Sequence, residues 1–330
     1  MPAVLPKKDT KEMKIAFLYS AYTDPQHLKR LIDVMPKGSE SFIHIDAKSD
    51  ICQFKAVVNG EHIHYLEQRY NVVWGSFRQT EYQIALIRAA LQSGIVFDYL
   101  MTMSGMEYPI WSNRRIEAFL TEKRKANKEL LQALCLTEQS KDQQRLYIRH
   151  WPYNNRPAKP GSLFSKYRVM MRKLMFALGR RKPLEFDADG HHYKLYKGSD
   201  WFAITPELGA FVLDRWDNSP QLRAYFEDSF TPSETAIHTI AFNSEEFFRN
   251  CIFNDGPYTR LVDLTPLTYI DYRPLVHILD ESYMDTLLSS EKMLCRKVIS
   301  GKSDLLMEQL DAHRAKEAQG YSMPNERSIS

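Results

Sequence analysis

The chain has 330 residues, 44% hydrophobic and 26% charged, which suits a globular protein with one large α/β domain or two smaller ones. Its net charge of +3 gives no overall argument for nucleic acid as a partner. The four cysteines form no Cys-x-x-Cys pair. This disfavours a zinc site, a redox pair or a disulfide framework, and we expect reduced thiols in a cytoplasm.

The two ends of the chain are polar. Segment 1–12 contains two prolines and lacks the apolar core of a signal peptide, so we expect a flexible extension there. No apolar run is long enough to span a bilayer. We therefore expect a cytoplasmic protein with a single domain over 13–318 and a disordered tail over 319–330.

The first third of the chain alternates strand and helix patterns. Apolar segments at 14–22, 41–46, 62–66 and 97–103 predict strands, and helical spacing predicts helices that begin with Pro25 and cover 78–92. This order predicts an α/β fold with a Rossmann-like, mostly parallel sheet and helices on both faces. In such a sheet the ligand lies beyond the carboxyl ends of the strands.

The expected strand ends carry small, acidic and aromatic residues. They are Ser20-Ala21, Asp46, Trp74-Gly75-Ser76 and Ser104-Gly105-Met106-Glu107. None of them is a GxGxxG or GxxxxGK[ST] loop, so a dehydrogenase or a P-loop protein loses its main support.

The later part of the chain begins with an irregular, basic segment over 139–182. Apolar and basic residues interleave across Lys166–Lys182, which predicts an amphipathic basic helix. Its apolar side could pack on the sheet, or it could contact an acidic membrane surface or a lipid-linked acceptor. Beyond it we expect a strand pair within 193–205, a helix over 206–216, and a second helix capped by Thr231 or Ser233 with Glu234 in its first turn.

Six blocks of the sequence, in this order, resemble one family: the core-2/I-branching β-1,6-N-acetylglucosaminyltransferases and peptide O-xylosyltransferases, called Branch, here as a bacterial-type member. The blocks are His44-Ile45-Asp46-Ala47-Lys48-Ser49, Val73-Trp74-Gly75-Ser76, Phe97 to Ile110, Lys197-Gly198-Ser199-Asp200-Trp201-Phe202, Pro232-Ser233-Glu234-Thr235 and Arg296-Lys297. The resemblance implies a GT-A-like fold and an inverting glycosyltransferase that works without a metal.

Metal independence agrees with the end of the central strand, where most GT-A enzymes carry Asp-x-Asp and this chain has Ser104-Gly105-Met106-Glu107. Asp187-Ala188-Asp189 matches the Asp-x-Asp pattern, but no clear apolar strand precedes it and Gly190 follows it. A metal site needs its acids fixed at a strand end, so we interpret this motif as a turn.

The resemblance assigns catalytic roles to a carboxylate and to basic side chains. Glu234 matches the general base, although the usual Pro-Asp-Glu is Pro-Ser-Glu here. Arg296 and Lys297 match the basic pair that stabilises the departing diphosphate, and Arg273 is a second-rank candidate. The structural alternatives are a helix-terminus role for Glu234 and solvated surface charge for the three basic residues.

The resemblance also assigns the binding of the two substrates. Donor binding falls to Ser20, Ala21, Asp46, Trp74 and Glu107, and acceptor binding to Glu107 and Trp201. The structural alternatives are core packing for the two tryptophans and capping for Glu107.

The sequence therefore predicts transfer of N-acetylglucosamine from UDP-N-acetylglucosamine to a hydroxyl of a glycan, with no cofactor. UDP-xylose is the alternative donor. The acceptor could be lipid-linked, with peripheral membrane contact through Lys166–Lys182 at the inner membrane face. A protein of another class, a catalytically idle glycan- or membrane-binding subunit, is also compatible with that basic segment and with the altered Pro-Ser-Glu motif.

Overall fold

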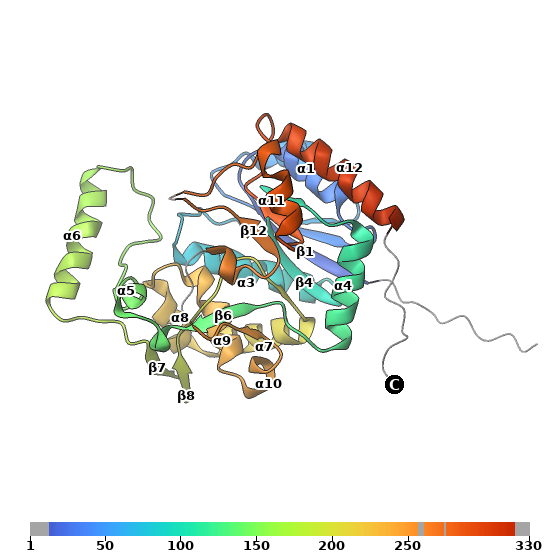
Figure 1. Cartoon of the computed structure of the whole chain (residues 1–330). Coiled ribbons are helices and arrows are strands. Elements are labelled where there is room, and N and C mark those ends of the chain that lie inside the picture. The colour runs from blue at the N-terminus through green and yellow to red at the C-terminus, as the bar shows by residue number, and fades with distance from the viewer. Residues whose placement is uncertain (1–12, 257–260, 274, 321–330) are drawn as a thin grey trace, which may run out of the picture.

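The computed structural model describes residues 13–256, 261–273 and 275–320. A five-stranded sheet with the strand order β10-β4-β1-β2-β3 lies at its centre (Figure 1). Its first four strands in the chain are parallel, and the short edge strand β10 is antiparallel to β4. The strands are β1 (Ile15–Ala21), β2 (Glu40–Ile45), β3 (Ile63–Tyr65), β4 (Tyr99–Ser104) and β10 (Ala203–Ile204). The predicted α/β class with a mostly parallel sheet is confirmed.

Helices cover both faces of this sheet, because alternate side chains of a strand point to opposite faces. On β1, Ala16 and Leu18 belong to one hydrophobic core and Ile15, Phe17 and Tyr19 to the other. The first core contains α3 (Phe77–Gln92), α7 (Pro206–Asn218), α8 (Pro220–Glu227), α9 (Ala236–Phe242) and α10 (Glu245–Phe248). The second contains α1 (Pro25–Val34), α2 (Ile51–Val57), α4 (Asn113–Lys125), α11 (Met284–Ser289) and α12 (Asp304–Gly320).

Smaller sheets connect the distant ends of the chain to the centre. Strand β13 is antiparallel to β5 and pairs Arg296 with Glu107, just beyond the end of β4. These sheets consist of β11 (Ile252–Phe253), β6 (Gln132–Cys135) and β9 (Tyr196–Lys197); β12 (Thr268–Ile270), β13 (Leu294–Arg296) and β5 (Glu107–Pro109); and the hairpin β7 (Glu185–Ala188) with β8 (His191–Lys194). The short helices are α5 (Lys141–Gln144), η1 (Leu136–Glu138), η2 (Pro232–Glu234), η3 (Leu261–Leu264) and η4 (Glu281–Tyr283).

Two local predictions need correction. The strands expected to pair within 193–205 bond elsewhere, β9 with β6 and β10 with β4. Glu234 lies in the 3-10 turn η2 that precedes α9, not in the first turn of a capped α-helix. Thr231 precedes a proline, and a residue in that position disfavours the right-handed helical conformation. Its φ is 40°, and its side chain makes no capping hydrogen bond within the described residues. Ser233 bonds the Asp200 carboxyl instead of capping a helix.

The Asp187-Ala188-Asp189 motif, predicted as a turn, is one only at its last residue: Asp187 and Ala188 end β7, and Asp189 with Gly190 forms the turn of the hairpin. Asp189 and Gly190 both have positive φ, 48° and 81°, which is the backbone twist favoured between two antiparallel strands. Asp187 pairs with His192 across the hairpin, and Asp189 accepts a hydrogen bond from the backbone of Gln221 at the start of α8.

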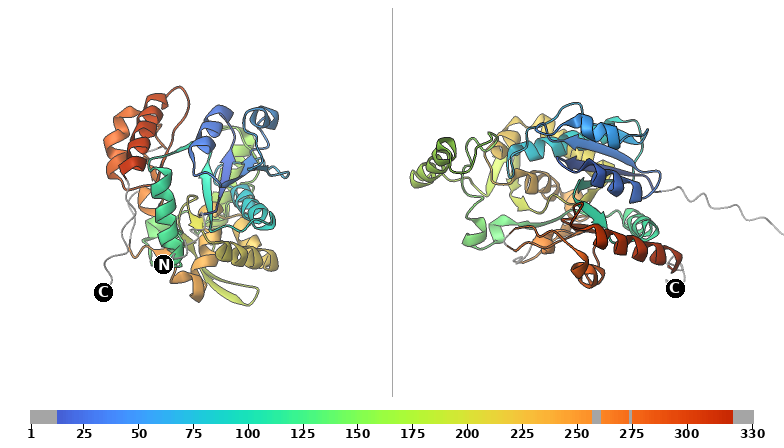
Figure 2. Two further views of the ribbon diagram at one scale, coloured as in Figure 1. Left: turned by 90° about the vertical axis from the view of Figure 1, so that its right-hand side faces the viewer. Right: turned by 90° about the horizontal axis from the view of Figure 1, so that it is seen from above.

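The predicted basic helix exists as α6 (Leu163–Ala177), but its apolar side does not pack on the sheet. None of its residues, all of which the structure describes, is buried. Figures 1 and 2 show it projecting from the body of the protein. No helix among the described residues has the length and apolar character of a membrane span. The segments expected to be flexible, 1–12 and 321–330, lie outside the described residues, and α12 includes the first two residues of the expected tail.

Candidate active site

Two adjoining cavities lie beyond the carboxyl ends of β1, β2 and β4. The first is about 340 Å³ in volume and the second about 550 Å³. They share six lining residues and so form one cleft, in the place expected for a parallel sheet. The shared residues are Ser20, Trp74, Gln79, Tyr82, Ser104 and Arg296.

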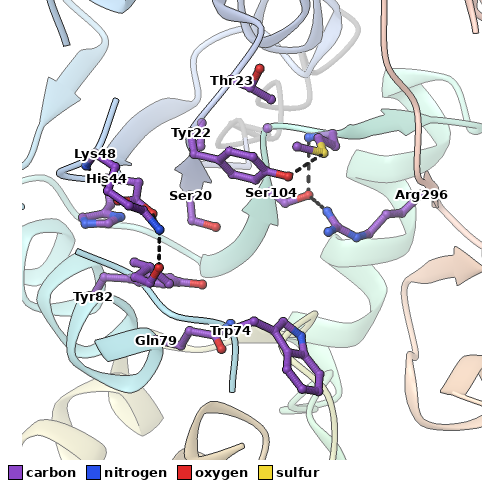
Figure 3. A pocket seen from close by; sticks show the side chains of 15 residues that line it. Ser20, Tyr22, Thr23, His44, Lys48, Trp74, Gln79, Tyr82, Ser104 and Arg296 are labelled. Carbon is purple, nitrogen blue, oxygen red and sulfur yellow. Dashed lines mark hydrogen bonds and ion pairs between the residues drawn. The ribbon is translucent and has the colours of Figure 1, made fainter. Parts of the chain in front are cut away.

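One side of the first cavity is formed by two aromatic rings, those of His44 near the end of β2 and Tyr82 of α3 (Figure 3). The His44 ring stacks on Tyr82, with centroids 4.8 Å apart and planes 10° apart. Burial lowers the pKa of His44 to about 4, so the ring is neutral, and it raises the pKa of Tyr82 to about 12. The predicted residues Ser20, Ala21 and Asp46 line this cavity. An uncharged wall of this kind suits a nucleoside.

Asp46 is nearly buried at the end of β2 and is fixed by its neighbours. Its Oδ1 accepts a hydrogen bond from the backbone of Lys48 at 3.0 Å, and the Lys48 ammonium lies 3.3 Å from Oδ2. The charge of this carboxylate is therefore partly balanced, while both residues line the cavity. Such a group can accept hydrogen bonds from ribose or base.

Trp74 stands at the rim that joins the two cavities. Its side chain is 72% exposed and lines both of them, so the alternative of a core tryptophan is wrong. Its ring contacts Phe230 edge to face, with centroids 6.4 Å apart. An exposed indole at a cavity rim offers a stacking surface for a planar ligand.

Arg296 reaches from β13 into the junction of the cavities (Figure 3). Its Nη1 donates a hydrogen bond to the Ser104 hydroxyl, and its guanidinium lies 5.0 Å from the centre of the Trp201 ring. Trp201 lines the second cavity, and its contact with an acceptor stays a prediction. A guanidinium with fixed partners in a cleft is suited to bind phosphate oxygens.

Glu107 lies behind the cleft wall, fully buried. Its Oε1 accepts hydrogen bonds from the backbone and the hydroxyl of Ser104, at 3.2 and 3.1 Å. Burial raises the pKa of Glu107 to about 7, and the nearby charge of Arg296 opposes this rise. Glu107 thus lies close to the residues that hold Arg296, and its direct contact with donor or acceptor stays a prediction.

The second cavity contains a cluster of one ammonium and two carboxyl groups. Glu234 lines it, and its Oε2 lies 3.0 Å from the Nζ of Lys197, whose side chain is 5% exposed. Asp200 lies beside them and accepts a hydrogen bond from Gln83 at 3.0 Å. Burial, and then the charge of Glu234, raise the pKa of Asp200 to about 6.

The backbone also fixes Glu234. The amide of Gly198 donates to the carbonyl of Glu234 at 2.9 Å, so Lys197 and Gly198 together hold both its main chain and its side chain. A Cβ at Gly198 would overlap the carbonyl oxygen of Gln132 and the His238 ring, which explains the glycine at this position.

Two predicted basic residues do not line the cleft. Arg273 is 71% exposed and forms a bidentate ion pair with Asp271, with its Nε 2.9 Å from Oδ1. Lys297 follows the last residue of β13 and lines neither cavity. Burial lowers the pKa of Lys297, as do the charges of Arg296 and Lys302. A role for either residue stays a prediction.

The cleft residues that were not predicted from the sequence include these four: His44, Tyr82, Lys197 and Asp200. Three of them lie inside blocks that carry the family resemblance, which was the available signal. Tyr82 lies within a predicted helix and has no motif that marks it. Within the described ranges, no three His, Cys, Asp or Glu side chains converge in a group that could hold a metal ion.

Comparison with known proteins supports the family that the sequence blocks resemble. The family model described as Core-2/I-Branching enzyme matches residues 15–271. Xylosyltransferase 2 of Homo sapiens is 25% identical over 228 residues, which are 66% of this chain and 23% of that protein. Xylosyltransferase sqv-6 of Caenorhabditis elegans is 23% identical over 210 residues, or 62% of this chain and 23% of that protein. The chain thus spans about a quarter of the length of these curated relatives.

Among solved structures, the apo form of mouse xyloside xylosyltransferase 1 aligns over 86% of this chain and 96% of that chain, with 10% identity and a TM-score of 0.32. The family match covers most of the chain and includes five of the six blocks. The chain belongs to the Core-2/I-Branching enzyme family, and its α/β fold is the GT-A-like fold predicted from the sequence.

Proposed function

We propose that the protein transfers a sugar from a nucleotide-sugar donor to a hydroxyl of a glycan acceptor, with inversion at the sugar carbon. One observation carries this proposal: Glu234 and Arg296 line the same cavity, and Arg296 also lines the cavity with the aromatic wall. A base and a phosphate-binding cation therefore share one cleft.

The chemistry needs proton removal at one end and charge stabilisation at the other. Glu234 accepts the proton of the acceptor hydroxyl, whose oxygen attacks the anomeric carbon while the bond from that carbon to the diphosphate oxygen breaks. The electron pair of this bond passes to the diphosphate, where the charge meets Arg296. Charge-assisted hydrogen bonds contribute about 1.5–3 kcal/mol each, so they can lower the barrier by a few kcal/mol.

The donor is UDP-N-acetylglucosamine in our first hypothesis. UDP-xylose is the second donor, and the names of the matched relatives, xylosyltransferase 2 and xylosyltransferase sqv-6, favour it. A screen of UDP-sugars for slow hydrolysis, read as UDP release, distinguishes the two. We expect one of these donors to react faster than UDP-glucose and UDP-galactose.

Metal independence is part of the proposal, and Arg296 at the junction of the cavities supports it. We expect activity to survive EDTA. A strict requirement for Mn²⁺ would contradict this mechanism. The cytoplasmic location and a lipid-linked acceptor also remain proposals; a membrane fraction and a water-soluble acceptor, supplied separately, would test the acceptor class.

Glu234→Gln provides the main test. We expect turnover to fall by about 10²- to 10⁴-fold, the usual contribution of a general base, while UDP affinity measured by calorimetry stays within about twofold. Glu185→Gln, an exposed carboxylate on β7, is the matched control and should keep full activity. Near-normal turnover of Glu234→Gln would remove Glu234 from its role. Absence of UDP binding to the unmodified protein would favour the idle binding subunit.

A further inference from the structure

The projecting helix α6 carries an apolar stripe that points to solvent. Residues spaced by three and four positions lie on one face of a helix. Such a series runs along the exposed side of α6 and its C-terminal cap, where Leu163 is 86% exposed and Met170 54%. The stripe consists of Leu163, Tyr167, Met170, Leu174 and Leu178.

The segment that carries this stripe is basic in sequence, although Lys182 at its end is buried and paired with Asp228. Between Asp142 and Glu185 the sequence has eleven basic residues and no acidic one, although the whole chain has a net charge of +3. Lys166 and Lys173 lie beside the stripe, in the shallow groove along the outer face of α6. The eleven residues are Arg145, Arg149, Arg156, Lys159, Lys166, Arg168, Arg172, Lys173, Arg180, Arg181 and Lys182.

Contacts on the opposite side of α6 fix this orientation. The guanidinium of Arg172 lies 4.2 Å from the centre of the Trp151 ring, and that of Arg149 lies 4.4 Å from the Phe176 ring. The side chain of Ser162 caps the helix by accepting from the backbone of Ser165 at 3.2 Å. The inner face therefore uses arginines to contact aromatic rings, and the outer face keeps leucine and methionine in water.

We infer that α6 is a docking surface for an anionic lipid bilayer. An amphipathic helix that lies in the interface buries its apolar stripe among the acyl chains, and its basic residues contact anionic headgroups. A second copy of the chain fits less well, because a symmetric contact would bring two basic segments together. Nucleic acid fits less well too, because the outward face of α6 is apolar along the stripe, and only Lys166 and Lys173 of the described helix lie beside it.

The stem of the projection reaches the rim of the cleft. The side chain of Asn154 donates to the carbonyl of Gly75 at 2.7 Å, next to Trp74. Trp151 packs on Phe230, with ring centroids 4.7 Å apart, and Phe230 lines the second cavity. Docking of α6 would therefore hold the cleft close to the bilayer surface. The docking itself does not depend on the proposed sugar transfer.

Vesicle co-sedimentation of the full chain tests the inference. We expect binding to vesicles of phosphatidylcholine with 30% phosphatidylglycerol, no binding to pure phosphatidylcholine, and loss of binding at about 0.5 M salt, where surface charges are screened. The double variant Met170→Glu/Leu174→Glu should not bind. Lys166→Ser/Lys173→Ser should bind roughly thirtyfold more weakly, since each lysine near an anionic surface contributes about one factor of five.

Matched controls lie on α12, which packs on the body of the protein. Leu305→Glu and Lys316→Ser change an exposed leucine and an exposed lysine there and should bind as the unmodified protein does. Circular dichroism and UDP affinity report whether each variant is folded. Absence of binding to anionic vesicles at low salt would overturn the inference, as would equal losses in the α6 and α12 variants. A dimer that Leu174→Glu dissociates would identify a second copy as the partner and would also overturn it.

Discussion

The cleft and the α6 projection use similar residues in opposite ways. In the cleft, Lys197 is almost fully buried and its ammonium pairs with Glu234. Along α6, Lys166 and Lys173 are exposed, and the leucine and methionine side chains beside them are exposed as well. A buried charge depends on its partner, whereas an exposed charge interacts mainly with water. A lysine therefore has different energetic consequences in the two regions, because it is buried in the cleft and exposed on α6.

Lys197→Met should show the largest effect on stability. It removes the partner of Glu234 next to the buried Asp200, and breaking a buried pair costs several kcal/mol. Because Glu234 retains some exposure, we expect the free energy of unfolding in urea to fall by about 3 kcal/mol. Lys173→Met on α6 is the matched control and should change it by less than about 0.5 kcal/mol. Equal losses of stability in Lys197→Met and Lys173→Met would contradict the expected difference between the cleft and α6.

Arg296→Met should weaken UDP binding by about 10- to 100-fold, because it removes a charge-assisted contact with the diphosphate. Arg273→Met removes an arginine that is paired with Asp271 away from the cleft, and we expect less than a threefold change. Lys297→Met tests whether the Lys297 side chain turns into the cleft when UDP binds, because UDP affinity would then fall. Calorimetry measures all three. A greater loss with Arg273→Met than with Arg296→Met would exclude the proposed diphosphate site.

Asp200→Asn should alter the pH dependence of stability. Burial raises the pKa of Asp200 from 3.8 to about 6, so the folded state holds this proton more tightly than the unfolded state does. The contribution of this group to stability is thus complete below pH 4 and is lost as the pH rises through 6. From pH 4 to pH 8, the free energy of unfolding of the variant should therefore rise by about 2 kcal/mol relative to that of the unmodified protein. Urea unfolding at both pH values measures it; Asp187→Asn, in the exposed hairpin, should show no such gain.

Trp74→Ala should have the smallest effect, a roughly fivefold loss of UDP affinity, because one exposed stacking contact contributes about 1 kcal/mol. Tyr167→Ala, an exposed aromatic residue on α6, should leave UDP affinity unchanged and weaken vesicle binding. If both variants changed UDP affinity alike, the projection would belong to the donor site.

The sequence by itself determined the strand and helix order of the first third, the family and part of the cleft. Strands β1, β2 and β4 follow from continuous apolar runs, and their ends carry Ser20, Asp46 and Ser104, because parallel strands bring their carboxyl ends to one edge. Trp201, Glu234 and Arg296 were found because each lies in a block that resembles the family.

Only the tertiary structure decided which charges are buried and which faces are covered. It places Arg296 rather than Lys297 in the cleft, because the pairing of β13 with β5 brings Arg296 next to Glu107, just beyond the end of β4. It brings Lys197 and Asp200 to Glu234 through contacts between segments about 35 residues apart. It also directs the apolar stripe of α6 to solvent. Local periodicity reveals that a helix has two faces, but what covers each face depends on segments far away in the chain.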